Sequence, residues 1–332
     1  MKTKVYSVLR PCDSDTLVVI LAPMNLPATQ LPHYRNSEII NASKLLINPA
    51  NSNFYQDCEI EVKELISSSL VTTQAKKLII CGSSMGGYGA LLFGPQFKET
   101  IALFSYAPAF RLDHPYSRSA LQMEVEHQNG SGSVTEGLAR TSADIHLFFP
   151  CFDHQDGVNI ADALALTGDY PHLAIHYLNC THDINTHLPL PELVNWYLQT
   201  SRIPEDKIAP LRASLYDARI AASTYALYCR ENGISVDIEF DHYPTERTAN
   251  WRYFYWKARN LAKMQKMWES VHNFIAAMEK GGLSVSEVQF CLANAYKDIG
   301  MTQAAVGHYR EADRIRPNDP TTLSAIDALT KQ

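Results

Sequence analysis

The first 200 residues alternate short, almost continuous apolar runs with segments of helical spacing such as 58–72. The apolar runs cover 16–23, 44–50, 76–81, 100–108, 145–152 and 172–179. Runs of this kind predict strands that are buried on both faces, because a half-exposed strand would alternate apolar and polar residues. Strands separated by helices predict an α/β fold with a doubly wound, mostly parallel sheet.

Three later segments depart from this rhythm. Residues 113–143 are polar, with "NGSGS" near the centre, and we interpret them as an insertion that forms either a lid or a surface loop. Residues 206–233 have long amphipathic helical spacing, and residues 234–240 alternate like a strand. This change of pattern predicts an α/β domain over 1–200 and a helical connector over 201–253.

The C-terminal region contains an internal repeat. Residues 292–320 carry small and aromatic residues at the spacing of a helix–turn–helix unit: Ala293, Tyr296, Gly300, Ala304, Tyr309, Ala312 and Pro317. A shift of 35 positions pairs Tyr309 with Phe274 and Ala312 with Ala277, so residues 256–282 are interpreted as a preceding, divergent repeat. The region 254–332 is therefore expected to be helical, with a final capping helix from 321.

Composition limits the classes of function. The chain has 332 residues, of which 46% are hydrophobic and 19% are charged, and its net charge is -6. This charge argues against general binding of nucleic acids, which needs clustered Lys and Arg. No apolar run approaches the ~20 residues of a membrane span, and no signal-peptide pattern begins the sequence. Seven scattered cysteines without a CxxC pair suggest neither zinc nor a disulfide framework, so we expect a reduced, cytoplasmic location.

The clearest chemical signal is the stretch "KKLIICGSSMGGYGALLFG", residues 76–94. Gly82 to Gly86 fit the pattern G-x-S-x-G, with Ser84 at its centre, an apolar strand before it and a helical pattern after it. In a nucleophile elbow this turn exposes the serine hydroxyl beyond the sheet, and glycines avoid collisions across the turn. The alternative is an ordinary glycine-rich connection between a strand and a helix.

A serine nucleophile needs a histidine base and an acid that orients the histidine. The strand at 145–152 leads to Asp153 and Asp156, and the strand at 172–179 leads to His182. The order serine, acid, histidine is the one expected after a nucleophile elbow. Both carboxylates remain candidates for the acid, and His187 is a second choice for the base.

A second pairing would use Asp183 as the acid and His242 as the base, but a long helical segment would separate them. For the oxyanion we expect the backbone amide of Met85 and an amide of Met24 or Asn25, which follow an earlier strand. Neither HExxH nor a phosphate-binding glycine motif is present, so no metal and no cofactor are expected.

Together, "GSSMGGYGAL" and the downstream Asp and "CTHDINTH" resemble the α/β-hydrolase superfamily over roughly residues 15–200. The motif is also similar to hydrolase-like proteins of bacterial polysaccharide machinery. The resemblance implies a serine esterase, with an O-acyl group on a glycan as one candidate substrate. Acyl transfer with the same triad, or a scaffold without activity, are the alternatives.

The repeats at about 254–330 resemble tetratricopeptide repeats, which implies contact with a partner protein or self-association. Two such repeats are few, because each unit needs neighbours to bury its apolar face. No nucleic acid and no membrane span are expected among the partners.

Overall fold

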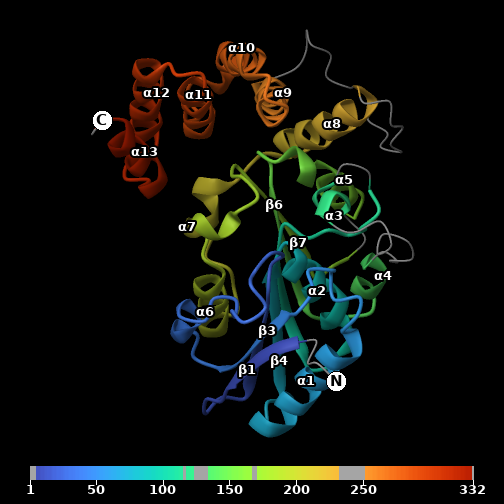
Figure 1. The fold of residues 1–332 in the computed structure, drawn as a ribbon. Helices are drawn as coiled ribbons and strands as arrows, with labels where there is room; N and C mark the ends of the chain where they lie inside the picture. Colours follow the sequence, from blue (N-terminus) through green and yellow to red (C-terminus); the bar gives the residue numbers. More distant parts are fainter. Residues whose placement is uncertain (1–4, 115–116, 123–133, 167–169, 232–250, 331–332) are drawn as a thin grey trace. The chain divides into compact units, whose positions relative to one another are not determined.

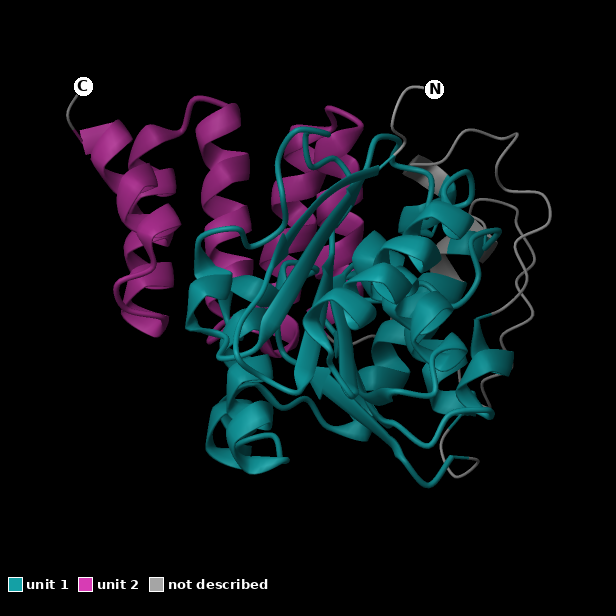
Figure 2. Ribbon diagram, turned by 90° about the horizontal axis from the view of Figure 1, so that it is seen from below, with its two compact units in different colours: residues 1–238 teal, residues 239–332 magenta. Residues whose placement is uncertain are grey.

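A computed structural model describes residues 5–114, 117–122, 134–166, 170–231 and 251–330. The chain divides into two compact units, residues 1–238 and residues 239–332, which Figure 2 draws in teal and magenta. We describe each unit by itself.

Within the described residues of the first unit, seven strands form one sheet in the order β1-β3-β2-β4-β5-β6-β7. The edge strand β1 runs antiparallel to β3, and every other pairing is parallel. The strands are β1 (Val5–Arg10), β2 (Thr16–Leu21), β3 (Ser43–Pro49), β4 (Lys77–Ser83), β5 (Thr100–Tyr106), β6 (Asp144–Pro150) and β7 (Leu173–Leu178). The six parallel strands are the six that the apolar runs predict, which confirms the mostly parallel α/β sheet.

Helices cover both faces of this sheet. Figure 1 shows α6 on one side and α1 and α2 on the other. Apolar residues of α6, such as Leu193 and Val194, share a buried cluster with Val18, Ile79 and Phe104 of the strands. The helices of this unit are α1 (Glu59–Thr73), α2 (Met85–Phe93), α3 (Arg118–Gln122), α4 (Thr135–Leu138), α5 (Gly157–Ala165), α6 (Leu190–Thr200), α7 (Glu205–Ile208) and α8 (Leu215–Glu231).

The parallel pairing of the strands determines where functional side chains can come together. Strands β4, β5, β6 and β7 run in the same direction, so their carboxyl ends lie at one edge of the sheet. The segments that follow β4, β6 and β7 contain the predicted serine, acids and histidine. Ligand sites of open α/β sheets lie outside this carboxyl edge.

The segment expected to form one long helix over 206–233 is broken. The short helix α7 ends at Ile208, a 3-10 turn spans Ala209–Leu211, and α8 begins only at Leu215. Pro210 lies in this turn, and proline has no amide hydrogen to continue a helical ladder. The strand predicted over 234–240 and the alternative base His242 lie outside the described residues.

The second unit is entirely helical in its described part. Its helices are α9 (Trp251–Lys263), α10 (Met267–Ala277), α11 (Ser286–Asp298), α12 (Thr302–Ile315) and α13 (Pro320–Thr330). The repeat-related pairs Phe274 and Tyr309, and Ala277 and Ala312, are all buried at 2% exposure or less. The predicted succession of an α/β sheet and an all-helical region is therefore confirmed. None of the described helices combines the length and the apolar character that a bilayer span requires.

Two histidines stack inside the first unit. His146 of β6 and His176 of β7 approach to 3.5 Å between Nδ1 and Nε2, and their rings stack on Phe104 and Phe148. Burial lowers the pKa of His146 to about 4, against an opposing effect of Asp144. Burial, His146 and Arg212 together lower the pKa of His176 to about 3. Both rings are therefore neutral in the folded protein at neutral pH.

We predict that stability falls as the pH drops from 6.5 toward 4. The unfolded chain takes up protons on these histidines near pH 6.5, whereas the folded protein does not. Each histidine can contribute up to about 1.4 kcal/mol per pH unit in this window, and its contribution is fully present above pH 6.5. Urea unfolding of the wild type and of His176→Phe at pH 8 and pH 5 measures this effect. Equal loss of stability in both proteins would contradict the prediction.

Candidate functional site

Ser84 occupies a strained turn between β4 and α2. Its backbone has φ 54° and ψ −117°, a positive-φ conformation that non-glycine residues rarely adopt. Two hydrogen bonds hold it there: the Ser84 amide donates to the carbonyl of Tyr106 (2.7 Å), and the Tyr88 amide donates to the carbonyl of Ser84 (3.0 Å). Strain of about 1–3 kcal/mol persists only where the surrounding structure fixes it, and it is frequent at active sites.

The glycines around Ser84 are required by close backbone contacts. A Cβ atom on Gly82 would lie 2.4 Å from the backbone of Gly86, across the turn. A Cβ atom on Gly86 would lie 2.3 Å from the carbonyl oxygen of Leu21, and one on Gly87 would lie 2.8 Å from that of Tyr106. The pattern G-x-S-x-G-G therefore lets the turn close and lets α2 begin directly against β2 and β5.

The structure pairs His182 with one of the two candidate acids. His182 Nδ1 lies 2.7 Å from Oδ2 of Asp156, whose side chain is almost completely buried. Part of the His182 side chain remains exposed. Asp153 has different partners: Arg118 of α3 donates to its Oδ2 (2.5 Å), and the Gln155 amide donates to its Oδ1 (3.0 Å). Asp156 is therefore the carboxylate that can orient His182.

A further residue connects the histidine loop to the serine turn. Asn185 Nδ2 donates to Oγ of Ser83 at 2.7 Å, and Asn185 Oδ1 accepts from the amide of Leu190 (3.2 Å). Because β5 and β6 separate β7 from β4, this bond means that the loop after β7 crosses back over the carboxyl edge to the turn of Ser84. The sequence analysis missed Asn185, since no motif distinguishes it from other loop asparagines.

Backbone amides for an oxyanion are present near the turn. The amide of Asn25 donates to Ser52 Oγ (3.1 Å) and is therefore occupied. Within the described residues, the amides of Met24 and Met85 have no hydrogen-bond partner. The contact of Gly86 with Leu21 places the backbone before Met24 against the start of α2. Of the two donors proposed for this loop, Met24 is the one that remains available.

The other candidates are placed differently. His187 follows the 3-10 turn Ile184–Thr186, and its amide donates to the carbonyl of Ile184. The exposed Asp183 precedes the same turn, while His242 lies outside the described residues. In the part of the chain that the structure describes, no group of three or more His, Cys, Asp or Glu side chains is arranged to hold a metal ion.

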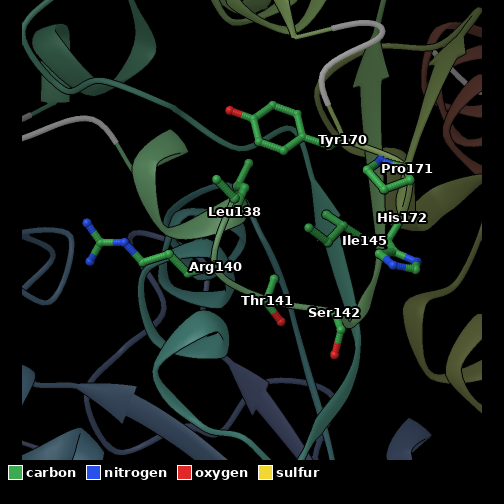
Figure 3. Close-up of a pocket in the computed structure, with 9 residues that line it drawn as sticks. Leu138, Arg140, Thr141, Ser142, Ile145, Tyr170, Pro171 and His172 are labelled. Carbon is green, nitrogen blue, oxygen red and sulfur yellow. The ribbon is translucent and has the colours of Figure 1, made fainter.

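A pocket of about 390 Å³ lies away from the serine turn, between the ends of α4, β6 and β7. Its lining includes Leu138, Ile145, Tyr170 and His172, and Figure 3 shows Arg140 extending away from the other side chains. Ile145 is near the start of β6 and His172 precedes β7, so this pocket lies at the amino edge of the sheet. It is therefore separate from the carboxyl edge where Ser84 and His182 lie.

No protein-family model and no curated protein match the chain. Among solved structures, a protein of the glycosylation-associated Gap123 complex from Streptococcus agalactiae is 17% identical over 60% of this chain, with a TM-score of 0.44. The alignment spans only 43% of that protein. An esterase from Pyrococcus furiosus is 15% identical over 60% of this chain and 83% of its own, with a TM-score of 0.42. The Arabidopsis OM64 TPR domain is 16% identical over 35% of this chain and 82% of its own, with a TM-score of 0.25.

We predict that Gly86→Ala destabilises the first unit by about 1–3 kcal/mol or prevents its folding, because the new methyl group meets backbone rather than a movable side chain. Gly307→Ala in α12 is the matched control, since its Cβ would meet nothing within 4 Å. Alanine in that helix should stabilise by up to about 1 kcal/mol. Thermal unfolding of both variants measures the difference. Wild-type stability of Gly86→Ala would refute the close-contact argument.

Proposed function

We propose that this protein is a serine hydrolase that cleaves an acyl ester through an acyl-enzyme. The carrying observation is the hydrogen-bonded pair of His182 and Asp156 on a loop that also reaches Ser83, next to the strained Ser84. Nucleophile, base and orienting acid thus come from segments at one edge of the sheet. The free amides of Met85 and Met24 support the same function.

In the proposed first step, Ser84 Oγ attacks the acyl carbonyl carbon while His182 Nε2 takes the hydroxyl proton. Asp156 accepts the hydrogen bond of the Nδ1 proton and stabilises the imidazolium that forms. The amides of Met85 and Met24 donate to the oxyanion. His182 then gives its proton to the leaving alcohol, and the ester bond breaks.

In the second step, His182 takes a proton from water, and the resulting hydroxide attacks the acyl-enzyme. The acid product leaves, and the proton returns to Ser84. Acyl transfer would use the same residues, with an alcohol in the place of water. A panel of p-nitrophenyl esters from acetate to decanoate, together with an O-acetylated glycan, identifies the acyl length and tests the glycan ester that the sequence suggested.

The helical second unit supports a role in protein contact or self-association. Its repeat-related positions are buried, whereas the large apolar side chains of Met264, Trp268 and Leu283 are more than half exposed. Exposed apolar residues of this size can contribute to a contact with a partner where they form one contiguous patch. A scaffold without activity is the alternative for the whole chain, and labelling of the serine decides between the two.

We predict that a fluorophosphonate probe labels the wild type and not Ser84→Ala, because only an activated serine attacks the phosphorus centre. Ser83→Ala is the neighbouring control and should still be labelled, although more slowly. Mass spectrometry of the labelled peptide identifies the residue. Absence of label on the wild type would refute the hydrolase and leave the scaffold.

We predict different outcomes for the two acids. Asp156→Asn should lower kcat by about 10³–10⁴, since the histidine loses the partner that fixes its tautomer. Asp153→Asn should keep kcat within about tenfold and lower the free energy of unfolding by about 1–3 kcal/mol, because Arg118 loses a buried partner. Ester kinetics and urea unfolding of both variants separate the roles. Loss of catalysis in Asp153→Asn alone would reverse the assignment.

A further inference from the structure

We infer that Asn185 is a positioning residue, which sets the distance between the base and the nucleophile by joining their two segments. This inference rests on the proposed function. It assigns to Asn185 and Ser83 a role that no motif in the sequence indicates.

The first step of the argument is the geometry of the bond. Asn185 lies three residues after His182, and Ser83 directly precedes Ser84. The hydrogen bond between their side chains measures 2.7 Å and joins residues that are 102 positions apart. It is a direct side-chain link between the loop after β7 and the elbow, so it limits how far His182 can move from Ser84.

The second step is that Asn185 is itself held in place. Its Oδ1 accepts from the amide of Leu190 at the start of α6, and this interaction leaves the Nδ2 group to point toward Ser83. The neighbouring Ile184 is buried in the same cluster as Tyr106 and Leu188. The chain is therefore anchored on both sides of Asn185, by Ile184 in the core and by Leu190 at the start of α6. These anchors hold the side-chain amide of Asn185 in place.

The third step concerns what the proposed role of His182 as general base requires. Among the described residues, His182 is held by Asp156 through Nδ1, and this single hydrogen bond lets the ring move with its loop. General base catalysis needs the other nitrogen within hydrogen-bond reach of the serine hydroxyl. A second anchor at the Ser84 end fixes the loop at the distance that the proton transfer needs, and small displacements of catalytic groups reduce rates strongly.

The test is a double-mutant cycle with Asn185→Ala, Ser83→Ala and the combined variant. We expect each single variant to lower kcat for p-nitrophenyl acetate and the labelling rate of Ser84 about tenfold, with KM changed less than about twofold. The combined variant should lose no more than the larger single effect, because both substitutions remove the same bond. Ser83→Thr, which keeps the hydroxyl, should retain more activity than Ser83→Ala.

Asn195→Ala is the matched control, since Asn195 of α6 is also partly buried and, in the described part of the chain, its side chain accepts from the exposed amide of Asn41 alone. It should leave kcat within about twofold of the wild type. Unchanged kcat in Ser83→Ala and Asn185→Ala, or additive losses in the combined variant, would overturn the inference while the labelled Ser84 still supports the hydrolase. A wild type that is not labelled would instead overturn the proposed function.

Discussion

The site depends on one steric constraint, the contact between the backbone of Gly86 and the carbonyl of Leu21. No side chain separates the first turn of α2 from the end of β2, so the helix starts directly at the edge of the sheet. The backbone of Ser84, just before this contact, has a positive φ of 54°. The same closeness brings the loop after β2, which contains Met24, near the start of α2. Steric fit at a glycine therefore determines the position of the polar groups.

The loops at the carboxyl edge of the sheet place the other residues of the candidate site. Asp156 follows β6 and His182 follows β7, so neighbouring strands bring the acid and the histidine together. The serine follows β4, which β5 and β6 separate from β7, and the loop that contains Asn185 covers this distance. The pairing of neighbouring strands thus explains the contact between Asp156 and His182. The course of the loop after β7 explains the contact between Asn185 and Ser83.

The sequence predicted strands β2 to β7, because continuous apolar runs leave little ambiguity. It was wrong to expect burial on both faces for β7, which lies at the other edge of the sheet and is mostly half-exposed. It missed β1, whose residues are mostly half-exposed at the edge of the sheet and lack such a run. It could not choose between Asp153 and Asp156, since both follow the same strand and their partners lie far away in the chain. Arg118 and His182 make that distinction only in three dimensions. Asn185 could not be identified from the sequence for the same reason, because it is a polar loop residue whose hydrogen-bond partner lies 102 positions earlier.

The ion pair of Arg118 and Asp153 connects the segment between β5 and β6 to the loop that follows β6. Arg118 belongs to the polar segment between β5 and β6, and its buried carboxylate partner lies three positions before Asp156. Removal or replacement of that segment would leave the Asp153 carboxylate buried without Arg118. The loop that contains Asp153 and Asp156 would then have to rearrange to hydrate this carboxylate. Redesign of the segment between β5 and β6 must therefore keep Arg118, or replace both members of the ion pair together.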